Sequence, residues 1–173
     1  REAAAAGGGG GEAVLAARLK LVGSCRHDGD AARIEALKAA AGELGVAAHV
    51  DFCVNVPYSE LQALLGGATA GLHTMVDEHF GISVVEYMAA GVVPIAHNSG
   101  GPKEDIVCEE GGRATGYLAA TVPEYATAIA AALSMGEARR VKMARAGRAR
   151  AGRFSEQEFT RGFKKAMECT MKE

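Results

Sequence analysis

Two glutamates separated by seven residues are the side chains best placed to do chemistry in this sequence. Glu78 is followed by His79-Phe80-Gly81, and Glu86 stands five residues after Gly81. The start of an expected helix lies between them, with N–H groups that have no intrahelical partner and with the positive end of the helix dipole. Such a helix start suits an anion, including a diphosphate. The alternative interpretation is two solvated glutamates on a strand–helix turn.

The segments around the two glutamates predict a strand, a helix and a second strand. Residues 69–74 form a short, mostly apolar run, and residues 92–96 form another. Between them one helix is opened by Gly81, which lets the backbone approach a ligand closely, and is closed by Gly91. Glu86 then lies roughly 9 Å along the helix axis, at about 1.5 Å per residue. A carboxylate there could accept hydrogen bonds from a ribose diol, as an acidic residue does in dinucleotide folds.

A second loop, Ser99-Gly100-Gly101-Pro102-Lys103, follows the second of these strands. Gly100 and Gly101 permit a close approach of the backbone to a ligand. Lys103 could face a phosphate or the sugar, or it could be a solvated lysine at the start of the next helix. Because ligands of doubly wound sheets bind beyond the carboxyl ends of the strands, this loop and the Glu78 loop are expected at the same edge.

The remaining chain alternates expected strands and helices, which predicts a parallel sheet. Further strands are expected at residues 19–23, 48–54 and 116–119, and further helices at 31–44, 59–66, 123–135, 137–150 and 156–171. The predicted class is α/β, with a doubly wound, Rossmann-like parallel sheet over residues 18–173. A flexible Ala/Gly-rich arm is expected at residues 1–17.

Capping residues mark four of the expected helix starts. Asp30 is placed to cap the helix that begins at residue 31. The capping-box pattern occurs three times, in Ser59-x-x-Gln62, Thr121-x-x-Glu124 and Ser155-x-x-Glu158.

The motif around the glutamates resembles the signature of the retaining glycosyltransferases of family 4. In that signature one glutamate is followed by Phe-Gly and the second, eight positions later, by Ala-Ala-Gly, as in residues 78–91 here. The flanking runs sharpen the resemblance to the branch of the family that uses GDP-mannose. These runs are Leu72-His73-Thr74-Met75, Met88-Ala89-Ala90-Gly91, residues 96–103, Leu133-Ser134-Met135 and residues 153–159. The resemblance covers nearly the whole chain from about Leu19.

The resemblance implies the C-terminal, nucleotide-sugar half of the GT-B fold, which has two Rossmann-like domains. It implies an α-1,2-mannosyltransferase that uses GDP-mannose to extend the dolichol-diphosphate-linked oligosaccharide for protein N-glycosylation. The configuration would be retained, and the reaction would take place on the cytosolic face of the endoplasmic reticulum membrane. Glu78 would be the catalytic residue. The implied donor-binding residues are Glu86, Phe80, Gly81, Ile82, Gly100, Gly101 and Lys103.

Some parts of the family's machinery are not recognised in this sequence. The acceptor-binding domain, which would also contact the membrane, is one of them, and the strand with a phosphate-binding Arg and Lys is another. The chain is therefore expected to be a fragment that is inactive alone. Three alternatives remain open: a nucleotide-binding module without catalysis, another family 4 hexosyltransferase, and an α/β interaction domain.

Composition fits an ordinary soluble α/β domain, with 173 residues, 49% hydrophobic residues and a net charge of −2. There is no run of 18 apolar residues, and no nucleic-acid partner is expected. The four cysteines are scattered without a CxxC pair, which indicates neither zinc nor a redox motif. Asp28-x-Asp30 has the spacing with which some other glycosyltransferases hold a metal, but Asp28-Gly29 favours a turn. No metal and no cofactor are expected.

A basic segment at residues 139–153 contains seven Arg or Lys residues and no acid. Such a segment could contact anionic lipid headgroups. Its charges spread around the whole of the expected helix, however, which favours an ordinary solvated helix.

Overall fold

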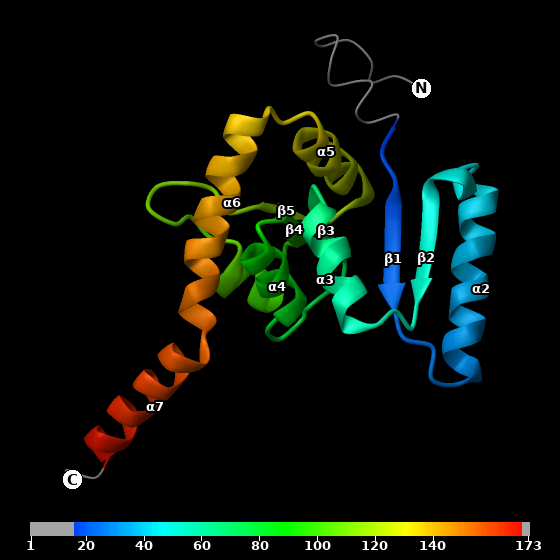
Figure 1. Cartoon of the computed structure of the whole chain (residues 1–173). Helices are drawn as coiled ribbons and strands as arrows, with labels where there is room; N and C mark the ends of the chain where they lie inside the picture. The colour runs from blue at the N-terminus through cyan, green and yellow to red at the C-terminus, as the bar shows by residue number, and fades with distance from the viewer. Residues whose placement is uncertain (1–15, 171–173) are drawn as a thin grey trace. The chain divides into compact units, whose positions relative to one another are not determined.

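The computed structural model of the chain describes residues 16–170 (Figure 1). The arm predicted at residues 1–17 therefore lies almost entirely outside the described residues. The chain divides into two compact units, of which the first ends at Gly67 and the second begins at Ala68. Each unit has its own parallel sheet.

The first unit is a strand–helix–strand arrangement followed by a helix. Strand β1 (Leu19–Gly23) pairs in parallel with β2 (Val50–Val54) along their whole length. Helix α2 (Asp28–Glu43) and the 3-10 turn η1 (Ala47–His49) connect the two strands, and α3 (Tyr58–Gly67) follows β2. Parallel strands need a crossover of this kind, so the predicted order of elements is confirmed.

Helix α2 begins earlier than predicted and has a different cap. It begins at Asp28, and the Nδ1 atom of His27 accepts the N–H of Asp30 at 3.2 Å. The Asp30 carboxylate instead accepts the N–H of Arg26 and forms an ion pair with Arg33. The prediction of Asp30 as the cap was therefore wrong, because its carboxylate has other partners in the same turn.

The three predicted capping boxes have different outcomes. Helix α3 already includes Ser59 in its first turn, so the first box was wrong. At the start of α5 (Val122–Leu133) both halves of the box between Thr121 and Glu124 are present. At the start of α7 (Glu156–Thr170) the hydroxyl of Ser155 accepts the N–H of Glu158 at 3.3 Å.

The second unit has a three-stranded parallel sheet in the order β3-β4-β5. These strands are β3 (Ala70–His73), β4 (Val93–His97) and β5 (Tyr117–Ala119). Helix α4 (Ile82–Ala90) connects β3 to β4, as predicted, and the short π-helical turn η2 (Pro102–Ile106) follows β4. The parallel pairing with helical connections confirms the α/β class.

Helices α6 (Glu137–Ala151) and α7 complete the second unit, with the 3-10 turn η3 (Gly152–Phe154) between them. The sequence predicted α5, α6 and α7 with ends that differ by only one or two residues. None of the helices among the described residues is both long enough and apolar enough to cross a membrane.

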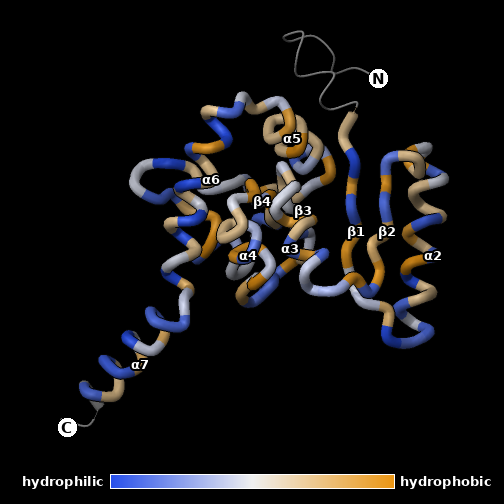
Figure 2. Tube along the Cα trace, in the orientation of Figure 1, coloured by the Kyte–Doolittle hydropathy of each residue, from blue (hydrophilic) through white to orange (hydrophobic). Residues whose placement is uncertain are grey.

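Strand β4 is the centre of the core, and the tube in Figure 2 shows its hydrophobic colouring. Because side chains alternate along a strand, its two faces belong to two clusters. Ala96 lies in the cluster that includes Val84 and Met88 of α4. Val93 and Ile95 lie in the cluster that includes Ala128, Ala132 and Met143 of α5 and α6. Helices α4 and α5 therefore cover opposite faces of the sheet.

Candidate functional site

The two predicted loops meet at the carboxyl edge of the three-stranded sheet. The N–H of Gly101 donates to the carbonyl oxygen of Glu78 at 2.8 Å. The N–H of Asp77 donates to the hydroxyl of Ser99 at 2.8 Å, and this hydroxyl lies 2.7 Å from Nδ1 of His97. These contacts fasten the loop that carries Glu78 to the glycine loop, as expected for loops that follow neighbouring parallel strands.

Gly100 and Gly101 lie so close to the backbone of the Glu78 loop that neither position has room for a side chain. Gly100 has a φ of +55°, and a Cβ atom there would lie 2.3 Å from the carbonyl oxygen of Glu78. A Cβ atom on Gly101 would lie 2.4 Å from the carbonyl oxygen of His79 and 2.6 Å from that of Phe80. The sequence predicted a close backbone approach, and the group that approaches is the neighbouring loop. Contact with a ligand stays a prediction.

Helix α4 begins at a glycine with a left-handed backbone. Gly81 has a φ of +92°, is buried, and accepts the N–H of Val84 at 2.9 Å. A Cβ atom on Gly81 would lie 3.0 Å from the Pro102 side chain. A larger residue is therefore strained here whether or not a ligand binds. The first N–H groups of α4, which the helix itself leaves unpaired, lie directly after this glycine.

The carboxylate of Glu78 is half-buried beside a histidine. Its side chain is 27% exposed, and its Oε2 atom lies 3.9 Å from Nε2 of His73, whose side chain is only 10% exposed. His73 is the last residue of β3. It was not predicted as a site residue, because it stands at the end of an apolar run. The signal that was available is a polar residue at the carboxyl end of a strand, directly before a ligand loop.

The other predicted site residues are more exposed. Glu86 lies on the exposed side of α4, and its carboxylate has no hydrogen bond or ion pair within the part of the chain that the structure describes. Phe80 and Ile82 are exposed on either side of Gly81. Lys103 is exposed as well, and its Nζ atom lies 3.4 Å from Oε1 of Glu104. The structure thus joins the Glu78 loop to Gly100 and Gly101, whereas the side chains of Glu86 and Lys103 point into solvent.

An aromatic contact that the sequence did not reveal supports the Glu78 loop. The ring of Phe80 meets the ring of Phe154 edge-on, with centroids 5.4 Å apart. The guanidinium of Arg150 lies 5.8 Å from the centre of the Phe154 ring and donates a hydrogen bond to the carbonyl of Asp105 in η2. Phe154 therefore links η3 to the Glu78 loop, and Arg150 links α6 to η2.

The basic segment has partners inside the protein. Arg150 and Arg153 both form ion pairs with Glu110, and Arg148 donates to the carbonyl of Ala89 at 3.0 Å. These three arginines fasten α6 and η3 to the rest of the second unit. Their contacts favour a structural role for this part of the segment.

Two tyrosines hold the end of β3. The hydroxyl of Tyr125 donates to the carbonyl of His73 at 2.9 Å, and that of Tyr87 donates to the carbonyl of Leu72 at 3.3 Å. Burial raises the pKa of both phenols above the ordinary tyrosine value. Both hydroxyls therefore stay protonated donors at neutral pH.

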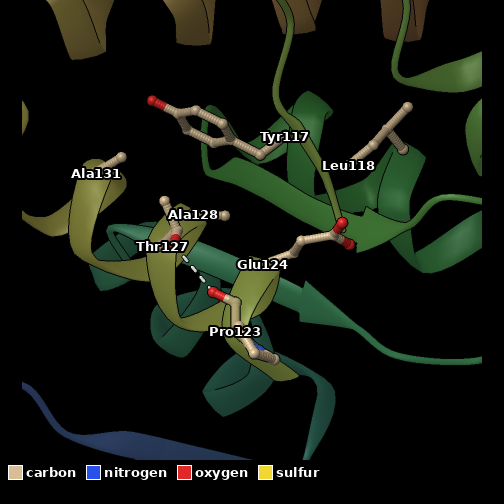
Figure 3. A pocket seen from close by; sticks show the side chains of 7 residues that line it. All are labelled: Tyr117, Leu118, Pro123, Glu124, Thr127, Ala128 and Ala131. Carbon is tan, nitrogen blue, oxygen red and sulfur yellow. Dashed lines mark hydrogen bonds between the residues drawn. The ribbon is translucent and has the colours of Figure 1, made fainter. Parts of the chain in front are cut away.

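A shallow hollow of about 360 Å³ lies elsewhere in the second unit, between β5 and α5 (Figure 3). It is lined by Tyr117, Leu118, Pro123, Glu124, Thr127, Ala128 and Ala131. None of the predicted site residues lines it. Its one carboxylate, Glu124, accepts the N–H groups of Ala120 and Thr121 at the start of α5. The loops around Glu78 remain the better candidate, because they combine a carboxylate with an open helix start.

Comparison with known protein families identifies the fold to which these loops belong. The family model described as "Glycosyl transferases group 1" matches residues 14–150. The chain belongs to the group 1 glycosyltransferases. Among solved structures, sucrose-phosphate synthase from Thermosynechococcus elongatus matches with a TM-score of 0.75 and 23% identity. The match covers 89% of this chain and 38% of the synthase chain, and it confirms the Rossmann-like fold.

Curated relatives of this group 1 glycosyltransferase chain are considerably more similar in sequence. A protein of Homo sapiens named GDP-Man:Man(3)GlcNAc(2)-PP-Dol alpha-1,2-mannosyltransferase is 46% identical over 155 residues, which are 90% of this chain and 32% of the human protein. The protein of the same name from Xenopus laevis is 49% identical over 146 residues, 84% of this chain and 30% of its own length. The chain thus spans about a third of the length of these relatives.

Proposed function

We propose that this chain is the donor-binding part of a retaining α-1,2-mannosyltransferase that uses GDP-mannose. Its acceptor is the dolichol-diphosphate-linked oligosaccharide that is built for protein N-glycosylation. The human and Xenopus relatives support this choice, since nearly half of the aligned residues are identical. The observation that carries the proposal is the position of Glu78 beside the open start of α4, at the edge of the sheet where such folds bind nucleotides.

The start of α4 binds the diphosphate of the donor. Its free N–H groups and positive dipole end favour a negative charge in front of the helix. Phe80, Gly81 and Ile82 form the backbone that frames this position, and the left-handed Gly81 turns the chain into the helix. Glu86 lies farther along α4, where its exposed carboxylate accepts hydrogen bonds from the ribose diol of GDP.

The Glu78 side of the site binds the mannose. Glu78 orients the sugar through its hydroxyls and does not act as the nucleophile. Gly100 and Gly101 form the opposite wall, and Lys103 turns from Glu104 toward the phosphates when the donor is present. No metal takes part in this proposal. Among the described residues, no three His, Cys, Asp or Glu side chains come together as metal ligands would.

The reaction takes place on the cytosolic face of the endoplasmic reticulum membrane. The name of the human relative supports a membrane as the place of the reaction, because a dolichol-linked oligosaccharide is membrane-bound. Membrane contact and acceptor binding are assigned to parts of the longer relatives beyond the matched third. No nucleic acid takes part.

Two experiments test the function. In the first, GDP, UDP and ADP are titrated by calorimetry into the chain and into a full-length chimera, in which this chain replaces the matching third of the human relative. GDP should bind most tightly to both. A preference for UDP would instead support another hexosyltransferase of the family.

The second experiment measures the transfer of radiolabelled mannose from GDP-mannose to a lipid-linked acceptor. The chimera should transfer mannose, and the 173-residue chain should not. Positioning of the acceptor supplies about 7–11 kcal/mol in favourable cases, and we assign this positioning to parts of the relatives beyond the matched third. A chimera that binds GDP and transfers no mannose would support the non-catalytic module.

A further inference from the structure

The backbone at the end of β3 is fixed from both faces of the sheet. Tyr125 of α5 bonds to the carbonyl of His73, and Tyr87 of α4 bonds to the carbonyl of Leu72. A Cβ atom on Gly71 would lie 2.4 Å from the Tyr87 ring, so this ring packs directly against the strand. The strand end that carries the His73 side chain is therefore held against both α4 and α5.

The imidazole of His73 is almost fully enclosed and incompletely paired. Its Nδ1 atom is buried and has no hydrogen-bond partner in the part of the chain that the structure describes. Its Nε2 atom lies 3.9 Å from Oε2 of Glu78. A buried polar atom without a partner is unfavourable to the folded state, so its presence in a folded protein calls for an explanation. The Glu78 carboxylate faces the other nitrogen, Nε2, and an ionised carboxylate can only accept. The proton of a neutral His73 ring is therefore placed on Nε2, and Nδ1 is left, among the described residues, as the acceptor without a partner.

We infer that His73 is a positioning residue for Glu78. The inference rests on the proposed role of Glu78 at the donor sugar. A separation of 3.9 Å is longer than a hydrogen bond, but contacts of this kind often shorten when the substrate binds. The Nε2–H of His73 then donates to one carboxylate oxygen of Glu78. This bond fixes the rotation of the carboxylate and leaves the other oxygen free for a sugar hydroxyl.

The other histidines of the second unit are placed differently. His97 lies next to Ser99, whose hydroxyl accepts the N–H of Asp77, so His97 supports the contact between the loops. His79 is exposed in the loop. Of these three histidines, His73 is the one that combines burial with a carboxylate of the site.

Steady-state kinetics of the full-length chimera test the inference. His73→Leu removes the donor at similar volume, and His73→Gln keeps an N–H group at similar reach. We expect kcat to fall about tenfold in His73→Leu, as for the loss of a hydrogen bond to a charged group, with an unchanged KM for GDP-mannose. His73→Gln should recover part of the rate. His49→Leu, an exposed histidine of η1, is the control and should behave as wild type.

A double mutant separates this inference from the proposed function. His73→Leu should cause no further loss of kcat in the Glu78→Gln background, because the group that it positions is already altered. Independent losses from the two substitutions would overturn the inference. So would a His73→Leu variant that has wild-type kcat, or one that changes only thermal stability. If Glu78→Gln itself has wild-type kcat, the proposed function of Glu78 fails instead.

Nitrogen NMR of the 173-residue chain gives a test that needs no histidine substitution. In the wild type, Nε2 of His73 should carry a proton, and its resonance should move in Glu78→Gln while that of His49 does not. A bare Nε2, or a resonance that is the same in both proteins, would contradict donation from His73 to Glu78.

Discussion

The two glutamates of the motif have unlike surroundings. Glu78 lies in a loop, with His73 beside its carboxylate and with its carbonyl oxygen bonded to Gly101. Glu86 lies on an exposed side of α4, and its position follows from the helix alone. The same sequence pattern thus contains one carboxylate that has a partner in the protein and one whose proposed partner is the ligand. Changes around the loops should therefore disturb Glu78 and leave Glu86 in place.

The largest expected effect comes from Gly100→Ala, which breaks the support of Glu78. A side chain at φ +55° is strained by about 1–2 kcal/mol. The new Cβ atom would also lie 2.3 Å from the Glu78 carbonyl oxygen, and overpacking of this kind adds about 1–3 kcal/mol. We expect a lower free energy of unfolding in urea and a lower kcat of the chimera in the transfer assay, with a smaller loss of GDP affinity.

Gly111→Ala is the matched control for this substitution. Its φ of +57° is nearly the same, but a Cβ atom there meets nothing within 4 Å. It should show only the backbone strain and no change in kcat. If Gly100→Ala and Gly111→Ala lower the free energy of unfolding equally, the Glu78 loop moves away from the new Cβ atom without destabilising the fold.

The next largest effect separates the two glutamates directly. In the chimera, Glu86→Gln should weaken GDP and GDP-mannose binding alike, by about 1.5–3 kcal/mol, because a charge-assisted bond to the ribose is lost. Glu78→Gln should lower kcat more than it lowers GDP affinity. Calorimetry and the transfer assay measure the two quantities. The division of roles is wrong if both variants lose the same GDP affinity.

Much of the fold and of the site's location could be predicted from the sequence. Apolar runs bounded by glycines gave the strands and α4, and the Glu-x7-Glu spacing indicated the edge of the sheet where the loops meet. Local patterns suffice there, because each element is encoded by neighbouring residues. The cap of α2 was missed because histidine is an unusual cap, and several polar side chains compete within that turn.

The supporting residues of the site could not be predicted, because their contacts join distant parts of the chain. Phe154 reaches Phe80 from a turn that lies far later in the sequence, and Tyr125 bonds to His73 across 52 positions. No spacing rule connects such residues. The close approach of the Glu78 carbonyl to Gly100 is another contact between separate loops that no local pattern indicates.

A smaller effect should come from the aromatic support of the Glu78 loop. Phe80→Leu, Phe154→Leu and the double variant form a cycle whose coupling free energy should be about 0.5–1.5 kcal/mol, as for an edge-on aromatic pair. Urea unfolding of the chain measures it. Phe154→Leu should also lower kcat of the chimera without changing GDP affinity.

Phe159→Leu is the control for the aromatic cycle. Phe159 stacks on Phe163 within α7, away from the two loops, so its replacement should leave kcat unchanged. A coupling near zero between Phe80 and Phe154 would mean that the loop keeps its position without the ring contact.

The smallest effect concerns Glu124, a third glutamate whose partners are all visible. Its Oε2 atom accepts the N–H groups of Ala120 at 2.6 Å and Thr121 at 3.0 Å, and these bonds hold the pKa of Glu124 below its usual range. A carboxyl group with a lowered pKa in the folded state stabilises the fold above its unfolded pKa, and this stabilisation is lost as the pH falls through the folded pKa.

Glu124→Gln should therefore be less stable than wild type at pH 7, and the difference should shrink in acid. Glu137→Gln, in the first turn of α6 where the cap residue Gly136 makes no side-chain hydrogen bond, should show a weaker pH dependence in thermal unfolding. If both variants respond to pH alike, the position at a helix start, and not the individual hydrogen bonds, determines how much a glutamate adds to the stability of the fold. The hydrogen bonds and ion pairs around Glu78 would then be a weak ground for expecting it to differ from Glu86, and the difference would have to come from the ligand.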